Sequence, residues 1–259
     1  MRTVRLPVSG IEVILRQPTG AEDILLLEAP ACDTALALDL VTRLGSATDG
    51  ATFAGDTLCV ADLDALLLLL RQMLLGDLIR TDVLCPAKEC GRRIDISFRI
   101  SEYLGYHTPR TARRVEPPDE AGWFRFCDVP VSFRLPSVSD QVAISRSTEP
   151  ERALIWACIR PAEISARMLK RVETAMEALA PNLSHPLQGQ CPECGATVDM
   201  YFDAQQFTLN ELRNQAMFIY EDVHLLASYY HWSQAEILAL PRSRRAQYTQ
   251  MVQQERSLV

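Results

Sequence analysis

Two short stretches with matching residues decide the fold of this chain. Residues 85–98 read CPAKECGRRIDISF, and residues 191–202 read CPECGATVDMYF. Aligned on the second cysteine, both continue with glycine, two variable positions, a β-branched residue, aspartate, an apolar residue, a variable position and phenylalanine. Each stretch is typical of a metal knuckle, which is a tight turn with two thiolates, followed here by a strand whose alternate residues face a core.

The spacing of the cysteines predicts a shared zinc site. Zinc takes four soft or borderline ligands at tetrahedral corners, and Cys-x2–4-Cys turns supply two ligands each. We therefore expect the two knuckles to meet and bind one Zn2+ through Cys85, Cys90, Cys191 and Cys194. Four thiolates leave no open coordination position, so this zinc would be structural and would clamp two parts of the chain together.

Several alternatives for these cysteines stay open. The alternatives are that one or both knuckles are turns without metal, that each knuckle binds its own ion, or that one pair of cysteines forms a disulfide. In a further alternative, His185, just before the second knuckle, replaces one thiolate as a zinc ligand. The remaining cysteines (Cys32, Cys59, Cys127 and Cys158) stand singly among apolar or small residues and are expected to be core thiols.

The composition predicts an ordinary globular protein. The 259 residues are 48% hydrophobic and 23% charged, with a net charge of −7. This acidity argues against a nucleic-acid binder, and the longest apolar run, 65–70, is too short to span a membrane. The N-terminus lacks an apolar signal stretch, so we expect a cytoplasmic protein with reduced cysteines.

The order of predicted elements repeats along the chain. We expect an α+β fold of two diverged copies of a hairpin–helices–zinc-knuckle unit, at 1–105 and 123–206, separated by a Pro/Arg-rich linker at 106–122. Pro136 and Ser137 correspond to Pro18 and Thr19, 118 positions earlier (136 − 18 and 137 − 19). A Gly/Ser/Thr-rich surface loop over 45–57 is expected in the first copy only.

Helix signals recur within each copy. Thr19 with Glu22 forms a capping box, Asp33 is a second N-cap, and Ser165 opens a helix that matches the apolar helix at 62–75.

Residues 207–259 predict a helical tail in the form of a hairpin. Apolar residues keep helical spacing over about 208–231, and His231-Trp232 ends that helix. Ser233 and Glu236 form a capping box, and Pro241 fits the first turn of a last helix that runs to about Val252.

The tail also carries the candidate partner-binding residues. We expect a protein–protein interaction surface made of aromatic, histidine and arginine side chains: Tyr220, His224, Tyr229, Tyr230, His231, Trp232, Arg242, Arg244 and Arg245. His224 and His231 are seven positions apart (231 − 224), too far for one metal ion. The chain has no Walker-type loop, no G-x-G-x-x-G and no G-x-S-x-G, so we expect no catalytic residues, no enzyme activity and no small-molecule substrate.

Several stretches resemble a known family. Residues 15–27 (LRQPTGAEDILLL), the first knuckle with 101–104 (SEYL), and 133–136 (FRLP) resemble T-even-type baseplate hub assembly chaperones of contractile phages and extracellular contractile injection systems. Residues 219–233 (IYEDVHLLASYYHWS) with 236–241 (EILALP) are similar to small helical proteins of the same kinds of locus. The resemblance implies a non-enzymatic structural or assembly chaperone role in a phage tail-like particle, with other baseplate, hub or spike proteins as partners.

A second function class competes with this one. A zinc ribbon is also a common fold of nucleic-acid-binding and transcription adaptor proteins. The acidic net charge and the absence of a basic stripe argue against that alternative.

Overall fold

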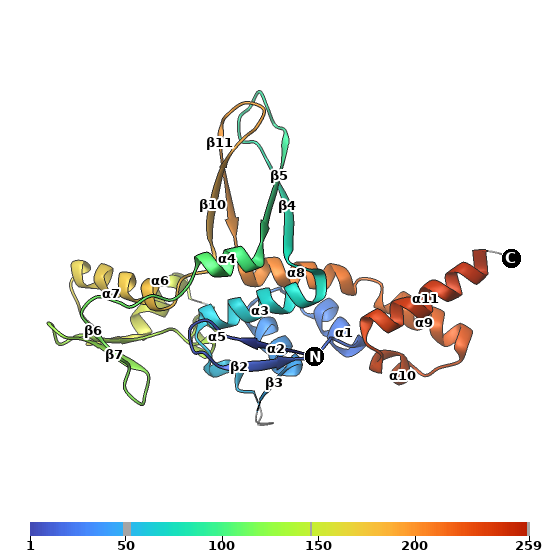
Figure 1. Cartoon of the computed structure of the whole chain (residues 1–259), viewed down its shortest axis with the longest axis horizontal. Helices are drawn as coiled ribbons and strands as arrows, with labels where there is room; N and C mark the ends of the chain where they lie inside the picture. The colour runs from blue at the N-terminus through green and yellow to red at the C-terminus, as the bar shows by residue number, and fades with distance from the viewer. Residues whose placement is uncertain (49–52, 146, 258–259) are drawn as a thin grey trace. The chain divides into compact units, whose positions relative to one another are not determined.

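The computed structural model describes residues 1–48, 53–145 and 147–257 of the chain (Figure 1). Its backbone forms two compact units, which we describe separately. The first unit comprises residues 1–4, 12–53 and 205–259, and the second comprises residues 5–11 and 54–204. The fold is mixed α+β with small antiparallel sheets, as expected. The domain boundaries of the sequence analysis stay a prediction.

The first unit combines a small sheet with helices. The sheet has the strand order β1 (Arg2–Arg5), β2 (Glu12–Leu15) and β3 (Gly45–Ala47). Helices α1 (Gly20–Glu28) and α2 (Thr34–Leu44) follow β2, and the Asp33 carboxylate caps α2 by accepting from Leu36 N–H. β3 occupies the start of the expected 45–57 loop, of which residues 49–52 lie outside the described residues.

Up to residue 257, where the described part of the chain ends, the tail of the first unit contains four helices, one more than the expected pattern of two long helices and a short one. They are α8 (Ala204–Ala216), α9 (Ile219–Tyr230), α10 (Gln234–Ala239) and α11 (Arg242–Ser257). The helix expected over about 208–231 is interrupted at Met217 and Phe218, both more than half exposed. Periodicity does not detect this interruption, because apolar spacing stays near helical on both sides of it. The Ser233–Glu236 capping box and the helix end at His231 are confirmed.

The second unit contains a four-stranded antiparallel sheet packed on a helix. The strand order is β6 (Val115–Glu116), β7 (Trp123–Phe126), β8 (Ser132–Arg134) and β9 (Ile159–Arg160). One face of this sheet is apolar, and α7 (Ala166–Leu179) packs against it through Val172 and Met176. Strand β6 lies within the stretch expected as a linker and pairs with β7.

The other helices of the second unit are α3 (Val60–Leu75), α4 (Ile100–Tyr106), α5 (Val138–Ile144) and α6 (Pro150–Ala157), with the 3-10 turn η1 (Gly55–Thr57) before α3. Helix α3 is buried on several sides, as its sequence predicts: Leu63, Leu66, Leu67, Leu68 and Leu70 are fully buried. Among the described residues, no helix has the length and apolar character needed to cross a bilayer.

Two β-hairpins carry the knuckles (Figure 1). β4 (Leu78–Leu84) pairs with β5 (Arg93–Arg99), and β10 (His185–Gln190) pairs with β11 (Thr197–Phe202). The registers correspond, because Leu84 pairs with Arg93 and Gln190 with Thr197, the residues that flank each knuckle.

The same polar arrangement occurs at the first helix of each predicted copy. Arg16 binds both carboxylate oxygens of Glu22, which also accepts hydrogen bonds from the N–H and hydroxyl of Thr19. The equivalent residues 118 positions later (134 − 16, 137 − 19 and 140 − 22) make the same contacts. There Arg134 binds both oxygens of Asp140, which accepts from the N–H and hydroxyl of Ser137.

Candidate metal centre

The four knuckle cysteines lie at the tips of the two hairpins. Each hairpin loop begins with a cysteine whose N–H donates across the loop. Cys85 donates to the carbonyl of Arg92 at 2.8 Å, and Cys191 donates to that of Ala196 at 2.9 Å. These bonds extend the ladder of each hairpin by one step, so the first cysteine of each pair is held by the strands themselves.

A glycine with positive φ follows the second cysteine of each pair. Gly91 has φ 53° and Gly195 has φ 74°. A Cβ at either position would meet no atom within 4 Å, so space does not require glycine there. The left-handed backbone does, because L-residues with a side chain adopt it only at a cost. This explains why the Cys-Gly pair recurs in both stretches.

The four sulfur atoms lie close enough together to surround one metal ion. The Sγ atoms of Cys85, Cys90, Cys191 and Cys194 all lie within 4.8 Å of one another. Cys85 Sγ is 3.6 Å from Cys194 Sγ, and Cys90 Sγ is 3.8 Å from Cys191 Sγ. A tetrahedral zinc with Zn–S bonds of about 2.3 Å requires S···S edges of about 3.8 Å. The cluster is therefore compatible with a metal ion.

These distances exclude a disulfide in this structure. A disulfide requires an S–S separation of about 2.05 Å, and all eight cysteines are free thiols. The close contacts also join the two hairpins crosswise, since the first cysteine of each knuckle lies against the second cysteine of the other.

Burial, nearby backbone N–H groups and the neighbouring thiols shift the thiol pKa values of the cluster unequally. Burial raises the pKa of Cys191, but the N–H groups of Cys194 and Glu193, together with the thiols of Cys194 and Cys85, outweigh it and lower that pKa to about 7. The Ala87 N–H lowers the pKa of Cys85, yet burial and the neighbouring thiols outweigh that donor and raise it to about 12. The pKa values of Cys191 and Cys85 therefore shift in opposite directions, and a cation among the sulfurs would favour the thiolate form of both.

Apolar side chains fill the space between the hairpins below the sulfurs. Cys85 and Cys191 are buried together with Val198, and Val83 and Ile94 of the first hairpin pack against them. Along β5 and β11, more buried residues alternate with exposed ones, which agrees with the strand pattern expected after each knuckle.

His185 does not belong to the sulfur cluster. Its Nδ1 lies 3.2 Å from the hydroxyl of Tyr103, and its ring stacks on that of Tyr103 with 5.8 Å between centroids. Burial and the neighbouring His107 lower the pKa of His185. The histidine therefore packs at the opposite end of its strand from Cys191.

The remaining cysteines differ in exposure. Cys158 is buried in the core under the β6–β9 sheet, as expected, and Cys32 and Cys59 are half-buried. Cys127 is exposed, which contradicts the expectation of a core thiol, because it directly follows the last residue of β7 where the chain turns.

Two of the three candidate arginines in the tail bind acidic residues inside the first unit. Arg245 is 1% exposed and pairs with Asp23 and Asp222, and Arg242 pairs with Asp23. Asp23 itself is fully buried on α1. The expectation that Arg245 forms part of a partner surface is therefore wrong, because its guanidinium is buried and pairs with Asp23 and Asp222 inside the unit. Arg244 is exposed.

The aromatic candidates of the tail split into two groups. Tyr230 and Trp232 are half-buried and stack with 4.8 Å between ring centroids. The other two, Tyr220 and Tyr229, are exposed, and both use their hydroxyls within the chain: Tyr220 donates to Glu28 at 2.6 Å and Tyr229 donates to Glu255. The histidines of this set, His224 and His231, are also exposed.

The structure adds residues that the sequence analysis did not select. Leu240 and Tyr248 line a small pocket together with Trp232, Arg244 and Glu236. Positions 244 and 248 of α11 are one helical turn apart, so they share a face of the helix. This spacing is visible in the sequence and could have indicated that Tyr248 lies beside Arg244.

The comparisons with known proteins give no relative: no family model matches the chain, and neither the curated proteins nor the solved structures include a match.

Proposed function

We propose that Cys85, Cys90, Cys191 and Cys194 bind one structural zinc ion that joins the two hairpins. The observation that carries this proposal is the pair of S···S distances, 3.6 and 3.8 Å, between cysteines of different knuckles. A zinc ion at the centre of the four sulfurs accounts for those distances and relieves the mutual repulsion of the thiolates. With four protein ligands the ion has no position for water or substrate, so its role is stability rather than catalysis.

The finer fold proposal is that the chain contains two diverged copies of one unit. The order hairpin, helix, helix, strand, helix, hairpin occurs first in β1 to β5 and again in β7 to β11. The added strand pairs with the second strand of the first hairpin in both cases, since β3 pairs with β2 and β9 pairs with β8. The two Arg–carboxylate–cap arrangements at a constant offset also support a duplication.

Metal analysis tests the site directly. Protein purified without added zinc should contain one zinc ion per chain, and Cys85→Ser should release it. Cys127→Ser removes an exposed cysteine outside the cluster and should leave the zinc content unchanged. Two zinc ions per chain would mean that the knuckles bind separately, and a full complement of metal in Cys85→Ser would overturn the shared site.

We further propose that the protein is a non-enzymatic component of the baseplate of a phage tail-like contractile injection system, in its structure or its assembly. This proposal rests on the resemblance of the stretches described above, and a zinc-joined body with a protein-binding helical tail suits such a role. Its partners are then other baseplate, hub or spike proteins, in the cytoplasm or in the assembled particle.

Deletion of the gene in the native host tests the proposed role. Sheath–baseplate particles should be missing or unable to contract, and a plasmid copy of the gene should restore them. Co-purification and mass spectrometry should identify baseplate proteins as partners. If particles form and fire normally without the gene, the proposal fails. A salt-sensitive gel shift of DNA would then favour the nucleic-acid adaptor.

A further inference from the structure

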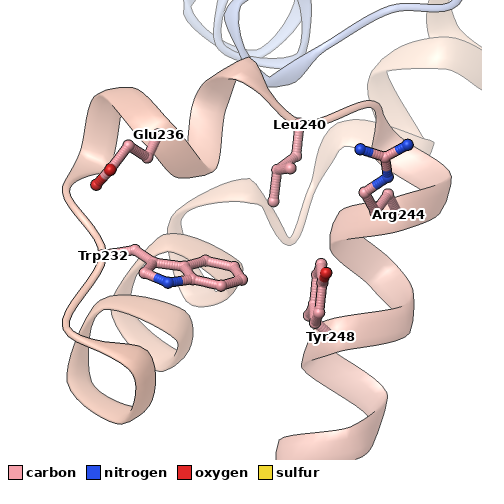
Figure 2. A pocket seen from close by; sticks show the side chains of 5 residues that line it. All are labelled: Trp232, Glu236, Leu240, Arg244 and Tyr248. Carbon is pink, nitrogen blue, oxygen red and sulfur yellow. The ribbon is translucent and has the colours of Figure 1, made fainter.

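The helical tail contains a small pocket lined by two aromatic side chains, one apolar side chain and two charged side chains. The lining residues come from the end of α9, from α10 and from α11: Trp232, Glu236, Leu240, Arg244 and Tyr248. Figure 2 shows the indole of Trp232, the side chain of Leu240 and the ring of Tyr248 converging on one space, with Arg244 at its edge. The pocket encloses about 240 Å³.

The aromatic walls are fixed by packing behind them. The rings of Trp232 and Tyr248 are perpendicular, with 5.1 Å between centroids, and Tyr230 stacks on the indole from another side. Trp232 and Tyr248 also pack on the buried core of the tail formed by Leu226, Ile237 and Val252. The apolar floor is therefore preformed, and a ligand would not have to order it.

The two charged residues of the rim differ in what they already bind. The Glu236 carboxylate accepts hydrogen bonds from the N–H and hydroxyl of Ser233 at 2.8 and 2.7 Å, and these bonds lower its pKa. Its carboxylate points away from the pocket in Figure 2. Within the described residues no carboxylate lies within ion-pair distance of Arg244, although Arg242 and Arg245 on the same helix are both paired.

We propose that this pocket receives one apolar side chain of a partner protein, whose neighbouring Asp or Glu carboxylate pairs with Arg244. An apolar floor with a single uncommitted cation at its edge is complementary to an apolar group beside an anion. The volume is below the roughly 300 Å³ at which small-molecule sites begin, so it suits a single side chain rather than a cofactor. This inference rests on the proposed protein-binding role of the tail.

The test measures binding of small probes to the full chain by NMR, using the indole N–H signal of Trp232, assigned with Trp232→Phe. N-acetylphenylalanine carries an aromatic group beside a carboxylate. N-acetylphenylalaninamide lacks the charge, phenylalaninamide carries a positive charge instead, and N-acetylalanine lacks the apolar group. We expect N-acetylphenylalanine to bind at least about 5-fold more tightly than each of the other three, by roughly 1 kcal/mol.

Arg244→Gln should remove the preference for the carboxylate while the amide still binds. Arg256→Gln provides the matched control, because Arg256 is exposed on the same helix and lies outside the pocket. Equal binding of acid and amide, tightest binding of the cation, or no shift with any probe would each overturn the inference. Concentration-dependent dimerisation that is lost in Arg244→Gln would assign the pocket to a second copy of the chain and would also overturn it.

This probe assay does not require particles, and gene deletion does not depend on the pocket. A chain that binds the probes but is dispensable for particles would refute the baseplate role alone. A chain that is essential for particles but indifferent to the probes would refute the pocket alone.

Discussion

The ring of Phe98 meets the ring of Phe202 edge to face, with 5.2 Å between their centroids. These residues occupy equivalent positions, each eight residues after the second cysteine of its knuckle (98 − 90 and 202 − 194). Tyr103 contacts both rings, at 5.2 and 5.5 Å. The two hairpins are therefore joined at both ends, by the sulfur cluster at their tips and by aromatic rings at their bases.

Replacing these phenylalanines should reveal their coupling. Phe98→Leu and Phe202→Leu remove the edge-to-face contact while keeping an apolar side chain. A double-mutant cycle on the zinc-loaded protein should give a coupling free energy of about 0.5–1.5 kcal/mol, measured by chemical unfolding. Phe98→Leu combined with Phe133→Leu is the control, because Phe133 lies in the separate core under the β6–β9 sheet and the two effects should add. A zero coupling for the first pair would contradict the joined-base interpretation.

The knuckle glycines should be needed for metal affinity. Gly195→Ala forces a side chain onto a backbone with φ 74°, which should cost about 1–2 kcal/mol and weaken zinc binding roughly tenfold. Competition with a zinc chelator measures this affinity. Gly91→Ala should behave in the same way at φ 53°.

Gly189→Ala provides the matched control for these substitutions. Gly189 lies in β10, has no positive φ, and has no atom within 4 Å of an added Cβ. Its replacement should leave zinc affinity unchanged. If Gly195→Ala binds zinc as tightly as Gly189→Ala does, the left-handed turn is not what positions the second thiolate.

The candidate site was predictable because its information is local. A Cys-Gly turn followed by an alternating strand occupies only fourteen residues (85–98). Its recurrence at 191–202 indicates that the two knuckles belong to one site. The strands that precede the knuckles, β4 and β10, were missed. Leu187 and Gly189 of β10 give no strand signal of their own, and pairing with β11 decides their conformation.

The tail shows where local signals stop being sufficient. The capping residues Ser233 and Glu236 were predicted because each cap is a four-residue pattern. The burial of Arg245 was not, because its partner Asp23 is 222 positions earlier in the chain. An arginine cluster at a helix start looks solvent-exposed in the sequence, and only the tertiary contact with a buried aspartate shows otherwise.

Breaking the ion pair between Asp23 and Arg245 should strongly lower the free energy of unfolding. Both side chains are at most 2% exposed, so Asp23→Asn leaves the buried guanidinium of Arg245 with Asp222 alone and also removes the carboxylate that pairs with Arg242. We expect a loss of about 3 kcal/mol or more in the free energy of unfolding, measured by denaturant titration. Asp39→Asn is the comparison, since Asp39 pairs with Arg43 in an exposed i,i+4 arrangement that should contribute at most about 0.5 kcal/mol. Equal losses for the two variants would show that burial of the Asp23 pair has no energetic effect.

Asp140 should make the stability of the second unit sensitive to acid. The Arg134 guanidinium holds the pKa of Asp140 far below its usual range, against the opposing effect of burial, and Ser137 adds two hydrogen bonds. A depressed folded pKa means that the unfolded chain binds this proton first. The stabilisation is therefore complete above about pH 5 and is lost as the pH falls below the unfolded value of about 3.9. Asp140→Asn should lower the free energy of unfolding by about 2 kcal/mol at pH 7, because it removes charge-assisted hydrogen bonds.

The difference between wild type and Asp140→Asn should shrink as the pH falls from about 5 toward 2, because over this range the Asp140 carboxyl of the unfolded wild-type chain takes up its proton while the folded one stays ionised. Thermal unfolding across that range measures it. Glu149→Gln is the control, because the Glu149 side chain is 67% exposed in its pair with Arg152. This substitution should change the free energy of unfolding by less than about 0.5 kcal/mol at every pH. A stability difference for Asp140→Asn that stays constant from pH 7 to pH 2 would mean that the substitution acts through packing. In that case pairing with Arg134 would not depress the pKa of Asp140. The same conclusion would then be expected for the equivalent pair, in which Arg16 contacts Glu22.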